Sequence, residues 1–203
     1  MDHGGKVKTF LEFDRHWGLG TSSTLISNLA QWSKTNPYTL LQASFGGSGY
    51  DIACATENHP LIYKRDTEGP CIKKCKFDPS FKSNLYFVYL NQKRKSKEAV
   101  NQFKKQKINE GQITHASQLT LAMVEAKTLY EFEQTINHHE MFVGNILGLK
   151  PIKEDRFSDF EGSIKSLGAW GGDFVLATGK SDTPNYFKSK GYPVILEYKE
   201  MIL

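Results

Sequence analysis

The stretch from Gly18 to Ser33, GLGTSSTLISNLAQWS, constrains the fold of this chain more than any other. Two glycines lead into a row of hydroxyl side chains, and apolar residues at helical spacing follow directly. This pattern predicts a helix that begins at a glycine-rich loop. The hydroxyls have two interpretations, since serine and threonine cap helices and the open N–H groups of a helix N-terminus bind phosphate. On this stretch alone, capping is the simpler interpretation.

The rest of the chain alternates between strand and helix patterns. Residues 6–14 indicate a strand before the glycines, and a short helix carrying Leu40 and Leu41 is expected after the first helix. Further along we expect a helix after a second glycine cluster, two long helices in the middle, and a short helix that opens at Thr183. Strands are expected at 60–65, 84–91, 172–179 and 192–198. This alternation predicts an α+β fold with helices on one face of an antiparallel sheet.

The polar segment 66–80, which contains two prolines, is the expected domain boundary. It divides the chain into an N-terminal domain of residues 1–78 and a C-terminal domain of residues 79–203. With 203 residues, 39% of them hydrophobic, the chain is long enough for one ordinary core or two small ones.

The composition excludes several classes of protein. A charged fraction of 24% and an aromatic fraction of 12% are typical of a globular chain rather than a disordered one. No apolar run approaches membrane-spanning length, and the first residues lack the apolar core of a signal peptide. The three cysteines are too few, and odd in number, for a disulfide framework. We therefore expect a soluble cytoplasmic protein with no membrane partner.

A basic run between residues 91 and 107 carries seven lysines and arginines against the single acid Glu98. Such a run is most simply the solvated face of a helix and its preceding loop. It could also collect an anionic substrate, or attract nucleic acid through charge. Because Phe103 is the only aromatic residue in the run that could stack on bases, we expect no nucleic-acid partner.

Two more glycine clusters carry candidate chemistry. The stretch GGSGYD places Asp51 directly after a flexible loop, where a carboxylate could accept a proton from a bound hydroxyl. Taken alone, Asp51 is more simply a helix cap or a turn residue. The stretch from Gly168 to Gly172, GAWGG, would let a backbone loop close over a neighbouring group, or it is only a turn between strands.

One candidate metal site is weak. His138, His139 and Glu140 are consecutive, but adjacent histidines on a helix point in different directions and do not share a site easily. His139 falls between Ile136 and Val143 on an apolar helix face, which indicates a core or pocket-edge histidine.

The ordered set GLGTSS, GSGYDIA and KSLGAWGGD resembles the GHMP kinase superfamily, the small-molecule kinases for galactose, homoserine, mevalonate and phosphomevalonate. GSGYDIACA is most similar to a bacterial "GYDIA" type of the mevalonate-pathway branch. The resemblance implies an α+β fold with a partial N-terminal ribosomal-S5-like domain and a ferredoxin-like C-terminal domain. It also implies that the N-terminal part of the family's fold is missing from this chain.

The resemblance implies a role for each matching residue. The triphosphate of ATP would lie against the first loop, and the Ser22 hydroxyl would contact Mg²⁺. Asp51 would be the catalytic residue, as general base or substrate orienter. Lys165 would face a substrate phosphate or carboxylate, although a strand-edge lysine in solvent is an equal alternative. The first loop comprises Gly18, Gly20, Thr21, Ser22 and Ser23, and the loop that closes beside the phosphates comprises Gly168, Ala169, Gly171 and Gly172.

The implied activity is transfer of the γ-phosphate of ATP to a hydroxyl or phosphate of an acidic metabolite, with mevalonate or phosphomevalonate first. Backbone N–H groups, a metal and one carboxylate would supply the positioning and charge stabilisation that phosphoryl transfer needs. The hydroxyl row would then serve as both cap and phosphate cradle.

Three departures from the family's pattern favour an alternative, and the missing N-terminal part is the first. No Asp or Glu lies between Asp14 and Asp51 to supply a further Mg²⁺ ligand, and Trp170 stands where relatives commonly have a small residue. Trp170 would either narrow the substrate pocket or pack against the sheet. The alternative is a catalytically incomplete GHMP-fold chain that acts as a ligand-binding or interaction module, and a homodimer is left open.

Overall fold

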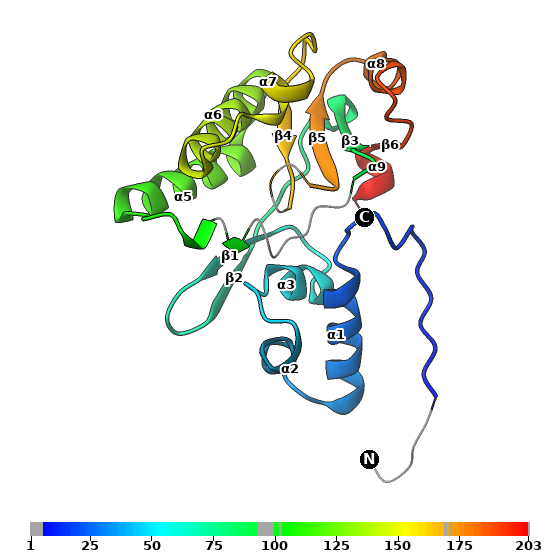
Figure 1. Cartoon of the computed structure of the whole chain (residues 1–203), viewed down its shortest axis with the longest axis vertical. Coiled ribbons are helices and arrows are strands. Elements are labelled where there is room, and N and C mark those ends of the chain that lie inside the picture. The colour runs from blue at the N-terminus through cyan, green and yellow to red at the C-terminus, as the bar shows by residue number, and fades with distance from the viewer. Residues whose placement is uncertain (1–5, 93–99, 102, 169, 171, 203) are drawn as a thin grey trace.

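The computed structural model describes residues 6–92, 100–101, 103–168, 170 and 172–202 (Figure 1). The N-terminal part contains helices α1 (Thr21–Ser33), α2 (Pro37–Ser44) and α3 (Tyr50–Thr56), followed by a hairpin of β1 (Leu61–Arg65) and β2 (Pro70–Lys74). The remaining elements are η1 (Lys82–Asn84), β3 (Leu85–Tyr89), α5 (Glu110–Glu125), α6 (Leu129–Leu147), α7 (Ile152–Arg156), β4 (Ile164–Ser166), β5 (Phe174–Thr178), α8 (Thr183–Ser189), β6 (Ile195–Glu197) and α9 (Tyr198–Met201).

A four-stranded sheet organises the C-terminal part of the chain. Its strand order is β4-β5-β3-β6, and every neighbouring pair is antiparallel. The chain passes through β3, the pair α5 and α6, then β4, β5, α8 and β6. This succession of strand, helices, two strands, helix and strand is that of a ferredoxin-like domain. The prediction of an α+β fold with an antiparallel sheet is therefore confirmed.

Both faces of this sheet are covered. Phe87 of β3 and Leu176 of β5 pack with Phe132 of α6, while their neighbours on the opposite face pack with Phe157 and Phe187. The prediction of helices on one face is wrong, because α7 and α8 cover the second face. Its physical reason is visible in LYFVY and FVLAT, since continuous apolar runs are typical of strands that are buried on both sides.

The three N-terminal helices pack around a small core of Ile26, Leu41 and Ile52. Their predicted positions are confirmed, and Asn36 caps α2 with its side chain directly before Pro37. The strand predicted at 6–14 is wrong: within the described residues this segment has no strand partner, and Phe10 is 87% exposed. A strand needs a neighbour for its backbone groups, and an apolar pattern does not supply one.

The predicted boundary segment 66–80 contains a strand that its polar composition concealed. β2 pairs with β1 over five residues, from Leu61 opposite Lys74 to Arg65 opposite Pro70. The division of the chain at residue 78 stays a prediction. No helix within the described ranges is long and apolar enough to cross a membrane.

Candidate active site

The first glycine-rich loop leads into the N-terminus of α1. Gly20 precedes the helix in a left-handed conformation, with φ 72° and ψ 25°, and no side chain caps the N-terminus. The Ser22 side chain is exposed, whereas Ser23 is buried. The prediction that the hydroxyl row caps the helix is therefore wrong, because Gly20 occupies the capping position. The first-turn N–H groups, which have no partner inside a helix, keep the partial positive charge that suits an anion.

The segment before α1 lies against the end of the sheet. The Trp17 ring packs edge-on against Phe174, with ring centroids 5.7 Å apart, and the Tyr89 hydroxyl donates to the His16 carbonyl at 3.2 Å. A Cβ atom added at Gly18 would overlap the Asp173 carboxylate. The first glycine-rich loop is therefore in direct contact with the residue that ends the third one.

The third loop is only partly described. Gly168 is exposed and has a left-handed φ of 56°, and Gly172 is buried beside Asp173. The predicted residues Ala169 and Gly171 lie outside the described residues. Within the described part, the structure brings the predicted phosphate loop and the predicted closing loop together, as Gly18 and Asp173 show.

Asp51 lies in the first turn of α3, two residues after the left-handed Gly49 with φ 86°. In Figure 1, α3 packs beside the N-terminal half of α1. Burial raises the pKa of the Asp51 carboxyl, and a hydrogen bond from the Tyr50 hydroxyl acts in the opposite direction. A half-buried carboxylate with a raised pKa suits a proton acceptor. Its catalytic role stays a prediction.

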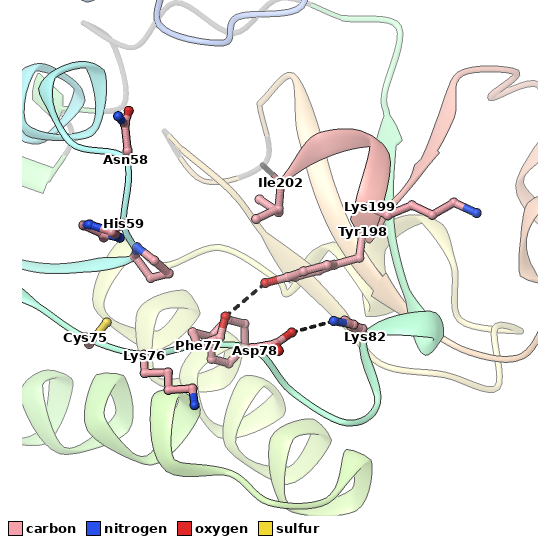
Figure 2. A pocket seen from close by; sticks show the side chains of 11 residues that line it. Asn58, His59, Cys75, Lys76, Phe77, Asp78, Lys82, Tyr198, Lys199 and Ile202 are labelled. Carbon is pink, nitrogen blue, oxygen red and sulfur yellow. Dashed lines mark hydrogen bonds and ion pairs between the residues drawn. The ribbon is translucent and has the colours of Figure 1, made fainter.

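A pocket of about 560 Å³ lies between the base of the β1–β2 hairpin and α9 (Figure 2). At its floor the Tyr198 hydroxyl donates to the Phe77 carbonyl at 3.3 Å, and Lys82 pairs with Asp78 at 2.6 Å. This pocket contains none of the residues predicted for the site. No three His, Cys, Asp or Glu side chains in the described part of the chain lie close enough to hold a metal ion.

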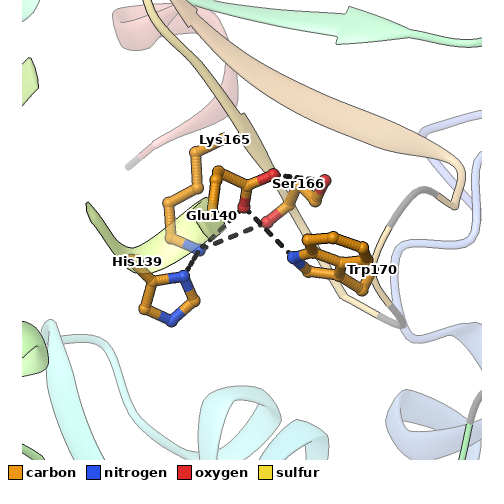
Figure 3. Close-up of polar contacts among 5 residues, drawn as sticks. All are labelled: His139, Glu140, Lys165, Ser166 and Trp170. Carbon is orange, nitrogen blue, oxygen red and sulfur yellow. Dashed lines mark hydrogen bonds and ion pairs between the residues drawn. The ribbon is translucent and has the colours of Figure 1, made fainter. Parts of the chain in front are cut away.

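Lys165 is enclosed by polar groups rather than extended into solvent. It lies on β4 with a side chain that is 15% exposed, so the solvent interpretation is wrong. Its ammonium Nζ is 3.3 Å from His139 Nδ1, 3.3 Å from the Ser166 carbonyl, and 4.0 Å from Glu140 Oε1 (Figure 3). Burial lowers the pKa of Lys165, and the Glu140 carboxylate opposes that shift.

Glu140 on α6 holds this cluster together. Its carboxylate accepts from the Ser166 hydroxyl at 2.8 Å and from Trp170 Nε1 at 3.2 Å, and its side chain is 3% exposed. Burial raises the pKa of Glu140, while Lys165 and these donors lower it. A buried charge needs such partners. The sequence interpretation missed this role, although Glu140 lies four residues after Ile136 on the apolar face of the helix.

The cluster forms one side of a second pocket, of about 440 Å³. Trp170 lines it with a buried ring and adopts a left-handed φ of 54°. The same ring packs over Gly144 of α6, where an added Cβ would lie 3.2 Å from the ring. Trp170 therefore lines the pocket and packs against α6. The lining residues are Val100, Phe103, His139, Val143, Leu147, Lys165, Ser166, Leu167, Gly168 and Trp170.

Comparisons with known proteins identify the fold. No protein-family model matches the sequence, and no curated protein matches it significantly. Among solved structures, Streptococcus pneumoniae phosphomevalonate kinase in complex with phosphomevalonate and AMPPNP matches with a TM-score of 0.68 and 17% identity, over 89% of this chain and 69% of that chain. The Lin0012 protein of Listeria innocua matches with a TM-score of 0.65 and 17% identity, over 89% and 66%. The mevalonate kinase of L. major in complex with R-mevalonate matches with a TM-score of 0.56 and 15% identity, over 89% and 64%.

The chain spans about two thirds of the length of these solved structures. At sequence identities of 15–17%, the TM-scores of 0.56 to 0.68 show a shared fold and nothing more specific. The similarity extends over both the three N-terminal helices and the ferredoxin-like sheet, since it covers 89% of this chain. The chain therefore has the α+β fold of the GHMP kinases, the fold of the mevalonate and phosphomevalonate kinases.

Proposed function

We propose that this chain is an ATP-dependent kinase of the GHMP type, which transfers the γ-phosphate of ATP to a hydroxyl or phosphate of a small acidic metabolite. The observation that carries the proposal is the contact of Gly18 with Asp173, which joins the open N-terminus of α1 to the third glycine-rich loop. A structure with the same fold is a phosphomevalonate kinase in complex with AMPPNP.

The phosphates of ATP would lie at the N-terminus of α1. The N–H groups of Thr21, Ser22 and Ser23 supply donors there, and the helix dipole favours negative charge. The exposed Ser22 hydroxyl and the Asp173 carboxylate, which lies against Gly18, are oxygen donors of the kind that Mg²⁺ prefers, with water as further ligands. A bound Mg²⁺ would neutralise charge on the phosphate oxygens. Asp173 thus supplies a carboxylate that residues 15–50 lack.

The acceptor would lie between Asp51 and the pocket of Lys165. The Asp51 carboxylate would take the proton of the acceptor hydroxyl, and its raised pKa brings it closer to working pH. The Lys165 ammonium would bind an anionic group of the acceptor. Mevalonate and phosphomevalonate are the first candidates, because the kinases that share the fold are named for them.

A thermal melt with and without saturating Mg-ATP tests the nucleotide site. Ligand at about a hundred times its dissociation constant stabilises a protein by roughly 2.7 kcal/mol, which is a rise of about 5–10 °C for a chain of this size. We expect this rise in the wild type and its loss in Ser22→Ala. Ser33→Ala is the matched control, because Ser33 ends the same helix at its other terminus. Equal rises in all three proteins would contradict the assigned phosphate loop.

A phosphoryl-transfer assay with R-mevalonate and R-phosphomevalonate tests the reaction. We expect Asp51→Asn to lower kcat by at least about a hundredfold, since general base catalysis contributes at that level. Glu57→Gln is the control, because this carboxylate lies at the far end of α3 and pairs with Lys74. Normal turnover by Asp51→Asn would refute the assignment. Stabilisation by ligand without any turnover would instead support the alternative of a ligand-binding module.

A further inference from the structure

The contact between His139 and Lys165 determines where the imidazole proton sits. An ammonium group has three donors and no acceptor, so His139 Nδ1, 3.3 Å from Lys165 Nζ, must accept. The proton of the neutral ring then lies on Nε2. Burial, together with the positive charge of Lys165, lowers the pKa of His139 to about 4. The ring is therefore neutral near pH 7, with a single N–H.

That N–H faces away from Lys165. In Figure 3 the second ring nitrogen of His139 lies on the side opposite to the Lys165 ammonium. Both residues line the pocket of about 440 Å³, whose other side chains are apolar except for Ser166. Two nitrogen donors, one of them charged, thus lie on opposite sides of the imidazole ring in an otherwise apolar pocket. Donors in such surroundings stabilise an oxyanion strongly, because little water competes for them.

Glu140 keeps the donor pair in place. It does not contact the ligand, because its side chain is 3% exposed and does not line the pocket, while Ser166 and Trp170 donate to its two oxygens. Its negative charge lies 4.0 Å from the Lys165 ammonium and opposes loss of the lysine proton. Glu140 is therefore a positioning residue, and the ligand's negative charge meets Lys165.

We propose that His139, through Nε2–H, donates to one oxygen of the acceptor, while the Lys165 ammonium on the other side of the ring (Figure 3) binds a separate, anionic oxygen. The proposal rests on the proposed function only for the identification of this ligand as the phosphate acceptor. It assigns a binding role to a histidine that the sequence pattern placed in the core or at a pocket edge. The site would take a carboxylate or phosphate attached to a short aliphatic body, which the apolar wall would cover.

Nitrogen-15 NMR of the histidine rings tests the tautomer without any activity. We expect the Nε2–H form for His139 in the wild type, with a pKa well below the ordinary histidine value of 6.5. In Lys165→Met we expect the pKa of His139 to rise and the preference for one tautomer to weaken. A wild-type ring that carries its proton on Nδ1, or that titrates near the ordinary histidine value of 6.5, would overturn the proposal.

Anion binding tests the ligand side, with R-mevalonate, R-phosphomevalonate and inorganic phosphate as probes in calorimetry. His139→Gln keeps an amide donor near the position of Nε2, whereas the shorter His139→Asn reaches only the position of Nδ1. We expect His139→Asn to weaken binding of the best organic probe by roughly 10- to 100-fold, and His139→Gln to restore most of it. His138→Asn is the matched control, and thermal melts verify that each variant folds.

The outcomes separate this inference from the proposed function. If the wild type transfers phosphate but His139→Asn binds acceptor normally and keeps its KM, the kinase stands and the role of His139 is refuted. If the tautomer and binding results hold but no acceptor is phosphorylated, the anion site stands and the kinase is refuted. If inorganic phosphate bound as tightly as the organic probes, the apolar wall would contribute nothing to affinity, and its contact with the aliphatic body of the ligand would be refuted. Absence of binding by all three probes would refute the site.

Discussion

Replacing Gly18 by alanine tests the contact that joins the two glycine-rich loops. Gly18 has a left-handed φ of 68°, and a Cβ there would overlap the Asp173 carboxylate. The alanine must therefore adopt a backbone conformation that disfavours any Cβ, and it must also displace a neighbouring side chain. Asp173 is short, and its own Cβ lies 3.0 Å from the added atom, so rotation of the carboxylate alone does not relieve the overlap.

The magnitude follows from these two effects. A left-handed conformation costs a residue with a Cβ about 1–2 kcal/mol. Overpacking a filled site by one carbon typically costs a further 1–3 kcal/mol. We expect the free energy of unfolding of Gly18→Ala to fall by about 2–5 kcal/mol.

Gly20→Ala is the matched control. Gly20 has nearly the same φ, 72°, but no atom lies within 4 Å of an added Cβ. This variant should lose only the backbone part, about 1–2 kcal/mol. Urea unfolding of both variants, followed by circular dichroism, measures the difference.

Equal losses in the two variants would show that Gly18 and Asp173 do not touch, and would refute the joined loops. A further check is Asp173→Ala in the Gly18→Ala background, which removes the overlapping carboxylate. The double variant should lose less free energy of unfolding than the sum of the two single losses, because the effects of substitutions at residues in contact are not additive.

Two further predictions concern the Lys165 cluster. Because the folded chain lowers the pKa of His139 from 6.5 to about 4, the unfolded chain binds a proton there first, and stability is lost as pH falls through this window. Urea unfolding at pH 7 and pH 5 measures this loss. Between the two pH values, the free energy of unfolding of the wild type should fall by about 1–2 kcal/mol more than that of His139→Gln, after allowance for the partial exposure of the ring. Equal pH dependence in the two proteins would refute the buried neutral ring. Trp170→Phe keeps the packed ring but removes the hydrogen bond to Glu140, and should lower the free energy of unfolding by about 1.5–3 kcal/mol. An unchanged melting temperature in Trp170→Phe would show that this hydrogen bond is absent.

The local parts of the fold could be predicted from the sequence, and the long-range parts could not. Glycines before an apolar repeat predict a helix start wherever they occur, and α1 and α3 begin as expected. The prediction of a strand at 6–14 was wrong because strand formation depends on a partner that is distant in the sequence. β2 was not predicted because its polar segment, with two prolines, resembles a linker. In the structure, β2 pairs with β1 along its whole length.

The candidate site divides in the same way. The proximity of the first and third loops follows from a family resemblance, and Gly18 supports it through its contact with Asp173. The burial of Lys165 was beyond sequence reasoning, because its partner Glu140 lies 25 residues earlier on another element. A carboxylate on an apolar helix face is the signal that could have indicated a buried ion pair.

The left-handed conformation of Trp170 has a consequence for how related sequences vary. A non-glycine residue at φ 54° is disfavoured on its own, and here the hydrogen bond to Glu140 and the packing over Gly144 hold it. A homologue with glycine at this position needs neither partner. Tryptophan at 170, an acidic residue at 140 and glycine at 144 should therefore be inherited together and lost together, as one covarying set.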